Sequence, residues 1–531
     1  SIPDGSVGSG GSNGTGGTNG TGGINGTSGT SSTGPDLLDG GPDATPNSAD
    51  ADADAGPHCG DGNWDVALDE ECDDGNDDHS DGCEVDCTQT TTEQIAIGID
   101  FTCALSGAGG VKCWGMDTYG TLAQGTTGND IIDPFQAPLL DFGTDRRVIQ
   151  ISARYYHACA LFEDGKARCW GRNQYGQLGR TSTDTYGDDP GEMLNAIGDI
   201  SLLNIQSVAA GQYDTCAILE SGSVYCWGYN LYGNLGIGSK QHVYHPSAPA
   251  VLDATATSLV MMNQTVCTAL AGGTARCWGN YPYGILGVGT INHAIGNGIG
   301  DGAGEGERPN DPDYNVKGLP GPLSAIGGGF QTSCAVVTGD VYCWGLNSAG
   351  QAGYPIGTYG TEIWQTPRAI NLGAINVVQL GVGWGHGCSL DDEGVVRCWG
   401  AGDEGENGYP GGREVGYDRD PVDDYLLMDS ADGGQADGGW PNGGRPAGLP
   451  LGAVDVGDFD GEPGLDPVVK VTLGHDATCA QMQTGGWRCW GNNALGRLGY
   501  DPSQATIGYE KSPAATYEDL GYADIRVFGP N

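Results

Sequence analysis

Seven versions of one short segment recur between residue 94 and the end of the chain. The second version reads HACALFEDGKARCWG, from His157 to Gly171. Each has a cysteine, a glycine-containing stretch, and a second cysteine followed by Trp and Gly. The first cysteines are spaced by 56, 57, 51, 67, 54 and 91 residues. The chain is therefore predicted to repeat one supersecondary unit seven times, with neighbouring copies stacked to build a common core.

Each copy is predicted to form a hairpin of two antiparallel strands, because apolar runs flank one or two glycines. Its two cysteines lie ten residues apart in six copies and nine apart in the fifth, which places them opposite each other across the hairpin. We predict that they pair as disulfides, with isolated thiols or metal ligands as the alternative. The predicted pairs are Cys103 with Cys113, Cys159 with Cys169, Cys216 with Cys226, Cys267 with Cys277, Cys334 with Cys343, Cys388 with Cys398, and Cys479 with Cys489.

The tryptophan after each second cysteine should point away from the disulfide, since successive side chains of a strand face opposite sides. We predict that these tryptophans pack between neighbouring sheets. They are Trp114, Trp170, Trp227, Trp278, Trp344, Trp399 and Trp490. The tails that follow, such as NQYGQLG (Asn173 to Gly179), place glycines where the backbone turns sharply.

The pattern CALxxxGxVxCWGxNxxGQLG resembles the repeats of the regulator of chromosome condensation 1 (RCC1) family over residues 94–531. The resemblance implies an all-β fold, a seven-bladed β-propeller, with a disulfide in each blade. We expect DIRVFG (Asp524 to Gly529) to be an extra copy of the strand VIQISA (Val148 to Ala153). It should lie beside QIAIG (Gln94 to Gly98) and fasten the ends of the ring.

The best-known member of this family binds a small GTPase and chromatin, but one fold hosts unrelated functions. The chain has 68 acidic and 22 basic residues, a formal net charge of −46, and it lacks a Lys/Arg cluster. This charge repels phosphate backbones, so nucleic acid is not expected as a partner. The chain is closer in character to secreted bacterial propellers of the family, which grip another protein with one face.

A tail and a small module precede the propeller, which we assign to residues 91–531. Residues 1–57 are rich in Gly, Ser, Thr and Asn, and residues 1–92 contain 19 acidic and no basic side chains. Such a composition buries too little apolar surface to fold alone. We predict a flexible acidic tether or, alternatively, a tail held by a neighbouring copy. Asn-X-Thr glycosylation sequences occur at Asn13, Asn19, Asn25 and Asn263.

Residues 58–90 form a small acidic module with four cysteines spaced by 13, 11 and 4 residues: Cys59, Cys72, Cys83 and Cys87. These spacings lack the C-x-x-C pairs of a zinc site, so we predict two disulfides and leave their connectivity open. The motifs CGDG, ECDDGN and DGC resemble the cysteine-rich repeat of myxobacterial-type surface proteins. The acidic crowd is either a calcium site or a solvated loop. It comprises Asp73, Asp74, Asn76, Asp78 and Asp81.

One insertion, VDVGDFDGEPGLDP (Val454 to Pro467), has the oxygen-ligand spacing of a calcium loop. The candidate ligands at positions 1, 3, 5 and 9 are Asp458, Asp460, Glu462 and Asp466. The stretch resembles the calcium loops of integrin-type propeller repeats, although a glutamate replaces the usual third Asp or Asn and a proline follows it. Calcium is the candidate cofactor, and we predict no organic cofactor.

We find no catalytic set of residues and predict that the chain is not an enzyme. His157 and His386 stand two residues before a repeat cysteine, a position that the family commonly fills with a structural histidine. His242 and His245 could face a metal, or could simply be surface histidines. Neither a Ser/His/Asp set nor a phosphate-binding G-x-x-x-x-G-K-[ST] motif is found.

The variable loops are the predicted binding surface, because the long insertions at 180–203, 288–324 and 401–466 each follow a glycine tail. Equivalent positions in a ring fall on one face. Its predicted aromatic contacts are Tyr175, Tyr232, Tyr281, Tyr283 and Trp440. We predict a non-catalytic β-propeller that binds another protein or a glycan through this face. The alternative is a structural subunit of an extracellular filament or surface layer, in which the tail contacts the next subunit.

The predicted location is extracellular or at the cell surface. Fourteen cysteines paired in hairpins require an oxidising compartment. The chain begins at Ser1 with a polar tail, as a secreted or lipid-anchored protein does after its signal segment is removed. No run of 18 apolar residues occurs, so no membrane span is predicted.

Overall fold

The computed structural model divides into two compact units, Ser1–Gly56 and Pro57–Asn531. Described are residues 72, 79, 83–144, 146–192, 194–280, 282–289, 315–353, 363–409, 453–457, 466–509, 511–520, 524–525 and 527–528. All of them belong to the second unit. The predicted tail 1–57 with its three glycosylation sequences lies outside the described residues, as do Cys59 and the acidic crowd of the module.

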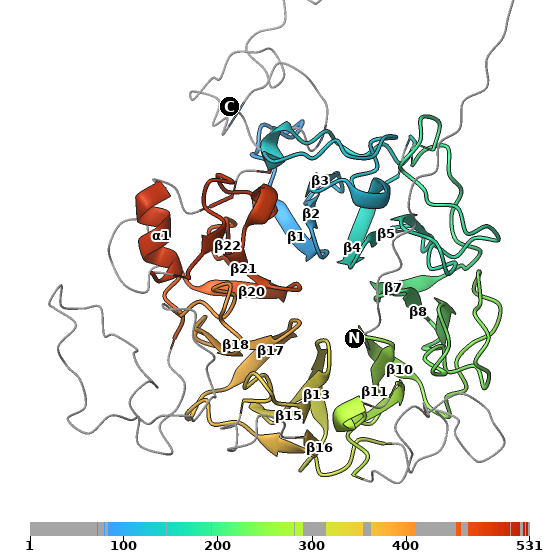
Figure 1. Cartoon of the computed structure of the whole chain (residues 1–531), viewed down its shortest axis with the longest axis vertical. Helices are drawn as coiled ribbons and strands as arrows, with labels where there is room; N and C mark the ends of the chain where they lie inside the picture. The colour runs from blue at the N-terminus through green and yellow to red at the C-terminus, as the bar shows by residue number, and fades with distance from the viewer. Residues whose placement is uncertain are drawn as a thin grey trace, which may run out of the picture. The chain divides into compact units, whose positions relative to one another are not determined.

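Seven antiparallel sheets, one for each repeat, are arranged around a central axis (Figure 1). The first strands, nearest the axis, are β1 (Thr92–Ile97), β4 (Val148–Arg154), β7 (Ile205–Ala210), β10 (Ala256–Met261), β13 (Leu323–Gly328), β17 (Val377–Val382) and β20 (Val468–Leu473). The second strands are β2 (Phe101–Ser106), β5 (His157–Phe162), β8 (Asp214–Leu219), β11 (Thr265–Leu270), β14 (Thr332–Val337), β18 (His386–Asp391) and β21 (Ala477–Met482). The predicted all-β, seven-bladed propeller is confirmed.

The remaining elements lie outside these two layers. The third strands are β3 (Val111–Gly115), β6 (Ala167–Gly171), β9 (Val224–Gly228), β12 (Thr274–Gly279), β15 (Asp340–Leu346), β19 (Val396–Gly400) and β22 (Trp487–Asn492). Two sheets gain a fourth strand, β16 (Ile363–Ala369) and β23 (Thr506–Ile507). The described helices are η2 (Thr118–Gly120), η3 (Pro134–Gln136), η4 (Pro282–Gly284), η6 (Ala494–Gly496) and α1 (Pro513–Leu520).

Each predicted hairpin pair forms a disulfide between directly opposite residues of the second and third strands. The paired Cα atoms lie 4.0–4.1 Å apart, somewhat closer than is usual for antiparallel partners. The fifth repeat absorbs its missing residue in a two-residue turn. Its central residues Thr338 and Gly339 both have positive φ, of 52° and 86°, as a hairpin turn matched to strand twist requires.

The Cys-Trp-Gly motif is explained by packing between blades. All seven tryptophans are fully buried, and five of them donate an indole hydrogen bond to a backbone oxygen in the tail of the preceding blade. Trp227, for example, donates to the oxygen of Gln177 at 2.9 Å. The glycine that follows has φ near +100°, and a Cβ on Gly228 would lie 2.5 Å from the oxygen of Tyr213. Only glycine fits there.

The C-terminal segment closes the ring differently from our prediction. In every repeat, the residue two positions before the second cysteine accepts a backbone hydrogen bond from an outer segment that follows the insertion. In the seventh repeat, the nitrogen of Ile525 donates to the oxygen of Trp487 at 2.9 Å. The segment is therefore the seventh copy of this outer segment and not an extra first strand. β1 already pairs with β2 on one edge and faces the axis on the other, whereas β23 pairs with the outer edge of β22 only at Gly491 and Asn492 and leaves Trp487 to the outer segment.

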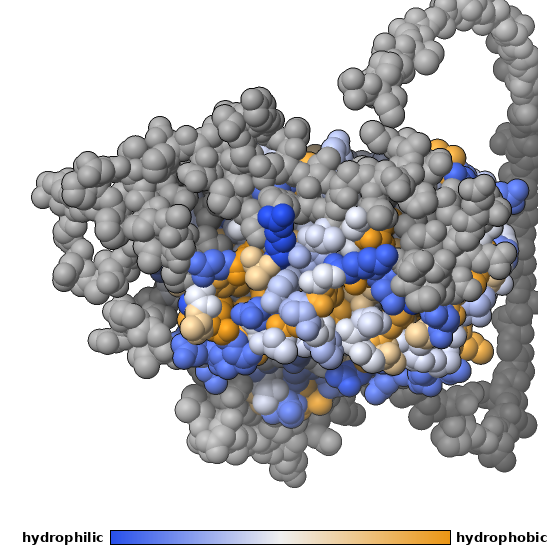
Figure 2. Space-filling model, turned by 90° about the horizontal axis from the view of Figure 1, so that it is seen from below, coloured by the Kyte–Doolittle hydropathy of each residue, from blue (hydrophilic) through white to orange (hydrophobic). Residues whose placement is uncertain are grey.

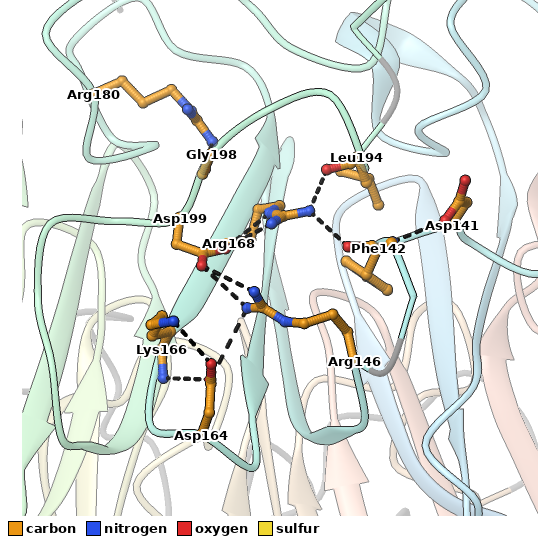
Figure 3. A network of polar contacts seen from close by, with 11 residues as sticks. Asp141, Phe142, Arg146, Asp164, Lys166, Arg168, Arg180, Leu194, Gly198 and Asp199 are labelled. Carbon is orange, nitrogen blue, oxygen red and sulfur yellow. Dashed lines mark hydrogen bonds and ion pairs between the residues drawn. The ribbon is translucent and has the colours of Figure 1, made fainter.

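In four repeats, a basic residue before the second cysteine binds the outer segment of its own blade and that of the preceding blade: Lys112, Arg168, Arg276 and Arg488. Figure 3 shows one case, in which Arg168 reaches Asp199 in its own outer segment, with distances of 3.1 and 2.7 Å. The same guanidinium donates to the oxygens of Phe142, in the preceding blade's outer segment, and of Leu194. Arg146 joins the network through the same carboxylate at 3.1 Å. Such charge-assisted bonds hold two blades together at their rim.

The first and last blades are joined by the same device. Lys112 donates to the oxygen of Val527 at 3.1 Å, and its ammonium lies 5.4 Å from the ring centroid of Phe528. Further in, Thr102 donates to the oxygen of Arg497 at 2.7 Å. The C-terminal segment therefore fastens the ring, at its rim.

Hydrophobic side chains on the side of the ring in Figure 2 form small groups between hydrophilic ones, where the described residues are uncovered. Surface groups of this size need no functional explanation. No helix among the described residues is both long and apolar enough to cross a membrane.

Candidate functional site

Seven residues gather at one end of the propeller axis. Each stands four positions before the first cysteine of its repeat, in the turn between the first and second strands. We call them the axial ring: Ile99, Tyr155, Gln212, Asn263, Phe330, Trp384 and His475. Because equivalent turns of a propeller meet around the axis, residues far apart in the chain come into contact here.

Tyr155 is the centre of these contacts. Its ring centroid lies 6.0 Å from Tyr213, 6.0 Å from Trp384 and 6.5 Å from His475. Its φ of 51° is in the left-handed region, which bulky residues rarely adopt and which often marks functional positions. Trp384 is stacked on Phe330 with ring centroids 3.6 Å apart, and its ring centroid lies 4.0 Å from that of His475.

A second set of tyrosines comes mainly from the glycine tails. Tyr175 lies 5.4 Å from Tyr213 and 5.0 Å from Tyr229, and Tyr119 lies 5.3 Å from Tyr156. We call the axial ring and this second set together the aromatic face. The second set comprises Tyr119, Tyr156, Tyr175, Tyr213, Tyr229, Tyr232 and Tyr283. Of the predicted aromatic contacts, Tyr175, Tyr232 and Tyr283 belong to it, whereas Tyr281 and Trp440 lie outside the described residues.

Arg172 occupies a cage of three of these tyrosines. Its guanidinium carbon lies 4.9 Å from the ring centroid of Tyr119, 5.8 Å from Tyr156 and 5.3 Å from Tyr213. A cation over the faces of several aromatic rings is attracted by their quadrupoles. The cage is therefore filled by the chain itself, and it brings a positive charge onto the aromatic face of a strongly acidic protein.

The opposite part of the face, on blades six, seven and one, is acidic. Burial raises the pKa of Asp100. Burial alone would also raise the pKa of Asp476, but the hydrogen bond from His475 and the charges of His475 and Arg497 outweigh it and lower that pKa. The nitrogen Nδ1 of His475 lies 2.5 Å from Asp476. A partner at this end of the axis therefore meets positive charge on one part and negative charge on another.

The candidate histidines are held in contacts within the propeller. His157 and His386 are fully buried, and their Nε2 atoms lie 2.9 Å from the hydroxyls of Thr215 and Thr478 in the next blade. Burial lowers their pKa values to about 3 and about 4, so both imidazoles are neutral. His242 is stacked on Tyr229 at 4.9 Å, and its Nδ1 accepts a hydrogen bond from the nitrogen of Asn230.

The metal predictions are only partly within the described chain. Asp458, Asp460 and Glu462 lie outside it, so the calcium loop stays a prediction. Asp466 is described, and its two oxygens accept hydrogen bonds from the backbone nitrogen and hydroxyl of Thr484 at 3.0 and 2.8 Å. Among the described residues, no group of three or more His, Cys, Asp or Glu side chains is arranged to hold a metal ion.

The small cysteine-rich module contains at least one of its predicted disulfides. Cys72 is bonded to Cys83, and Cys87 is also disulfide-bonded. A hydrogen bond from Thr90 to Glu84 at 2.8 Å lies within the module, at its C-terminal end. This connectivity could not be derived from spacing alone.

Glu406 is the unusual member of a set of buried tail residues. In the second and fifth repeats the same position holds Gln177 and Gln351, whose side-chain oxygens accept a hydrogen bond from the backbone two residues earlier. Glu406 makes the equivalent bond, to the nitrogen of Glu404 at 2.9 Å. Burial raises the pKa of Glu406 to about 8, so near neutral pH it is mostly protonated and resembles glutamine.

Glu406→Gln is expected to stabilise the propeller at high pH only. The raised pKa means that the glutamate disfavours folding increasingly as the pH rises from about 4.5 to about 8. The variant should gain about 1–3 kcal/mol in free energy of unfolding at pH 8 and little at pH 4, as measured by urea denaturation. Gln351→Glu is the matched control and should show the opposite sign. Equal effects at the two pH values would contradict this account of Glu406.

Sequence reasoning missed the axial ring and Arg172. The seven positions of the axial ring share no residue type, so a search for repeated motifs does not detect them. A positional signal was present, because aromatic residues or His stand four positions before the first cysteine in four of the seven repeats: Tyr155, Phe330, Trp384 and His475.

Comparison with known proteins agrees with the repeat pattern. Models of the Regulator of chromosome condensation (RCC1) repeat match residues 93–121, 148–177, 205–234 and 377–406, and residues 164–218 and 221–260. The Ultraviolet-B receptor UVR8 of Arabidopsis thaliana is 28% identical over 348 residues, covering 64% of this chain and 71% of UVR8. The E3 ubiquitin-protein ligase HERC2 of Homo sapiens is 27% identical over 322 residues, covering 59% of this chain but 6% of HERC2.

Solved structures show the same fold at low sequence identity. Yeast RCC1 (Prp20), in its complex with Kap60, has a TM-score of 0.56 at 18% identity and covers 80% of this chain and 84% of that one. Human WBSCR16 has a TM-score of 0.54 at 17% identity and covers 75% of this chain and 88% of that one. With seven disulfide-bonded hairpins that carry the repeat motif, the chain is an RCC1-like repeat protein.

Proposed function

We propose that this chain is a non-catalytic extracellular or cell-surface propeller that binds another protein through the aromatic face. The observation that carries the proposal is the continuous set of tyrosines around Arg172 on repeats one to three. Tyr, Trp and Arg are the residues that protein interfaces favour and that dominate their binding energy. RCC1-like propellers bind proteins, as yeast RCC1 does in its complex with Kap60.

The disulfides support the location in this proposal. The described cysteines contain no free thiol, and stable cysteine pairs are typical of oxidising compartments. The absence of catalysis is proposed because the buried histidines are neutral and bonded to threonines. The glycan partner and the calcium loop remain weaker proposals, because no described feature favours a sugar over a protein and three calcium ligands lie outside the described residues.

A binding experiment with matched variants tests the proposal. The immobilised full chain is incubated with extracellular protein from its native source, and bound proteins are identified by mass spectrometry. We expect Tyr175→Ser with Tyr229→Ser to reduce capture of the specific partner about tenfold or more. The control is Ile149→Ser with Val469→Ser, which changes exposed apolar residues at the other end of the first strands. Equal capture by all three proteins would overturn the proposal.

The same experiment addresses self-assembly. If the captured protein is this chain itself, and deletion of residues 1–57 abolishes capture, the structural-subunit alternative is supported over binding of a different protein.

A further inference from the structure

Part of the second repeat's insertion is docked on blade one. We call this part, residues 184–192, the docking loop. Its Tyr186 exchanges two backbone hydrogen bonds, of 2.8 and 3.2 Å, with the last residue of β6. The oxygen of Gly187 accepts from the nitrogen of Gly125 in blade one at 2.9 Å. A Cβ on Gly120 would lie 2.4 Å from the carbonyl carbon of Gly187, so the two backbones are in direct contact.

Asp117 of blade one stands where four other repeats have a fully buried asparagine. These are Asn173, Asn230, Asn347 and Asn493. In blade two, Asn173 accepts from the nitrogen of Leu178 with its Oδ1 and donates with its Nδ2 to two backbone oxygens of the following loop, at 3.0 and 2.8 Å. Asp117 keeps the first bond, from the nitrogen of Leu122 at 3.3 Å. Its Oδ2, however, is buried without a hydrogen-bond partner among the described residues, and the residue is 1% exposed.

The charged groups around Asp117 are also acidic. The Oδ1 of Asp130 accepts from the backbone nitrogen of Asp117 at 3.0 Å. Asp188 of the docking loop adds a second negative charge. Burial raises the pKa of Asp117 to about 6 and these two charges raise it as well, although backbone N–H groups that bond to the carboxyl lower it.

The docking loop ends in a second carboxyl of this kind. Glu192 shares a hydrogen bond with the carboxyl of Asp188, and such a bond needs a proton on one of the two. The Oε2 of Glu192 is buried and receives no hydrogen bond from a donor group of the described residues. Burial raises the pKa of Glu192 to about 6, and the bond to Asp188 and the negative charges of the loop add to this effect. The other aspartates that act on it are Asp184 and Asp189.

The arginine that is packed on the docking loop interacts with a different carboxylate. The guanidinium carbon of Arg180 lies 4.8 Å from the ring centroid of Tyr186, and the guanidinium donates to the oxygen of Gly198. Its charge acts together with that of Asp199 and not with those of the docking loop. The charges that act most strongly on Asp117 and Glu192 are therefore all negative.

We propose that the contact between the docking loop and blade one depends on protons. It is closed while Asp117 and the pair of Asp188 and Glu192 each hold a proton, and it opens to water when these groups ionise. An ionised carboxyl without enough donors is costly to bury, and opening of the loop restores its hydration. Tyr119, two residues after Asp117, forms one side of the cage around Arg172, so the docking loop borders the aromatic face.

The direction of the pH effect follows from the two raised pKa values. Between about pH 4 and about pH 6, the closed state binds more protons than the open state. Closure is therefore strongest at low pH, weakens as the pH rises through about 6, and changes little beyond it. Because one unit of pKa corresponds to a factor of ten in equilibrium, the open fraction should rise at least about tenfold between pH 5 and pH 8.

Amide hydrogen exchange of the full chain tests this inference, with labelling times scaled for the intrinsic pH dependence of exchange. Peptides that contain Gly125 and Tyr186 should lose at least about tenfold in protection between pH 5 and pH 8. The equivalent loop of blade three is the internal control. Asn230 holds it through two amide hydrogen bonds, of 2.7 and 2.9 Å, so its protection should not change.

Two variants are matched to this experiment. Asp117→Asn with Glu192→Gln places a neutral group at both positions and should make the protection of the docking loop equal at the two pH values. Asn230→Asp places a carboxyl in blade three and should create a pH dependence in the control loop. The melting temperature of each variant checks that it is folded.

Three outcomes would overturn the inference. The first is equal protection of the docking loop at pH 5 and pH 8 in the parent chain, and the second is a pH dependence that persists in the folded double variant. The third is closure at pH 8 by excess calcium as complete as that by acid, which would make a cation the ligand in place of a proton. No partner protein is needed, so these results do not depend on the proposed function.

Discussion

Removing residues 524–531 is expected to lower the free energy of unfolding of the propeller by about 5 kcal/mol, from three lost side chains at about 1.5–3 kcal/mol each. Ile525, Val527 and Phe528 are at most 8% exposed in the folded chain. The deletion also takes from Lys112 its acceptor on the last blade. Thermal and urea unfolding of the shortened chain would measure the loss.

A shorter deletion distinguishes the loss of ring closure from a general effect of truncation on stability. Removing only residues 529–531 keeps every contact named above, so its melting temperature should equal that of the full chain. Lys112→Met should show an intermediate loss, because it removes the bond to Val527 but keeps the buried apolar side chains. If the eight-residue deletion unfolds at the same denaturant concentration as the full chain, the outer segment does not hold the ring closed.

Trp227→Ala is expected to cost about 3–5 kcal/mol in free energy of unfolding, as large-to-small changes of buried aromatic residues do. The indole is fully buried and bonds to the tail of the second blade, so its removal would leave a large cavity between the second and third blades. Urea denaturation with the disulfides intact would give the change.

Replacement of Trp227 by phenylalanine would measure how much of this loss in free energy of unfolding is due to the indole hydrogen bond. Trp227 donates to the oxygen of Gln177, whereas the buried Nε1 of Trp114 has no hydrogen-bond partner. Trp227→Phe should therefore cost about 1 kcal/mol more than Trp114→Phe. Identical costs at the two positions would show that the indole bonds add nothing to blade packing.

The sequence predicted those features that depend only on contacts within one repeat. Two cysteines at a fixed interval in adjacent strands of a hairpin lie opposite each other, so the disulfides could be predicted, and so could the tryptophans on the opposite side of the sheet. The C-terminal segment was misassigned because the apolar alternation of Ile525 and Val527 fits a first strand and an outer segment equally well. Only the part of the β22 edge that β23 leaves unpaired, at Trp487, distinguishes the two.

The candidate site was harder to predict because it is assembled across repeats. Tyr175 and Tyr232 could be chosen from their repeated place in the glycine tails. The contact of Tyr155 with Trp384 depends on the ring being closed, and the two residues share neither a type nor a motif.

The confinement of every propeller disulfide to a single hairpin has a consequence for biogenesis. Each cysteine finds its partner nine or ten residues further along the chain, and a loop of that length closes within about 10–100 ns. Correct oxidation can thus proceed repeat by repeat, because each thiol meets its partner without waiting for any other repeat. Duplication or loss of a whole repeat would leave every other cysteine with its disulfide partner. The number of repeats can therefore change without creating an unpaired thiol.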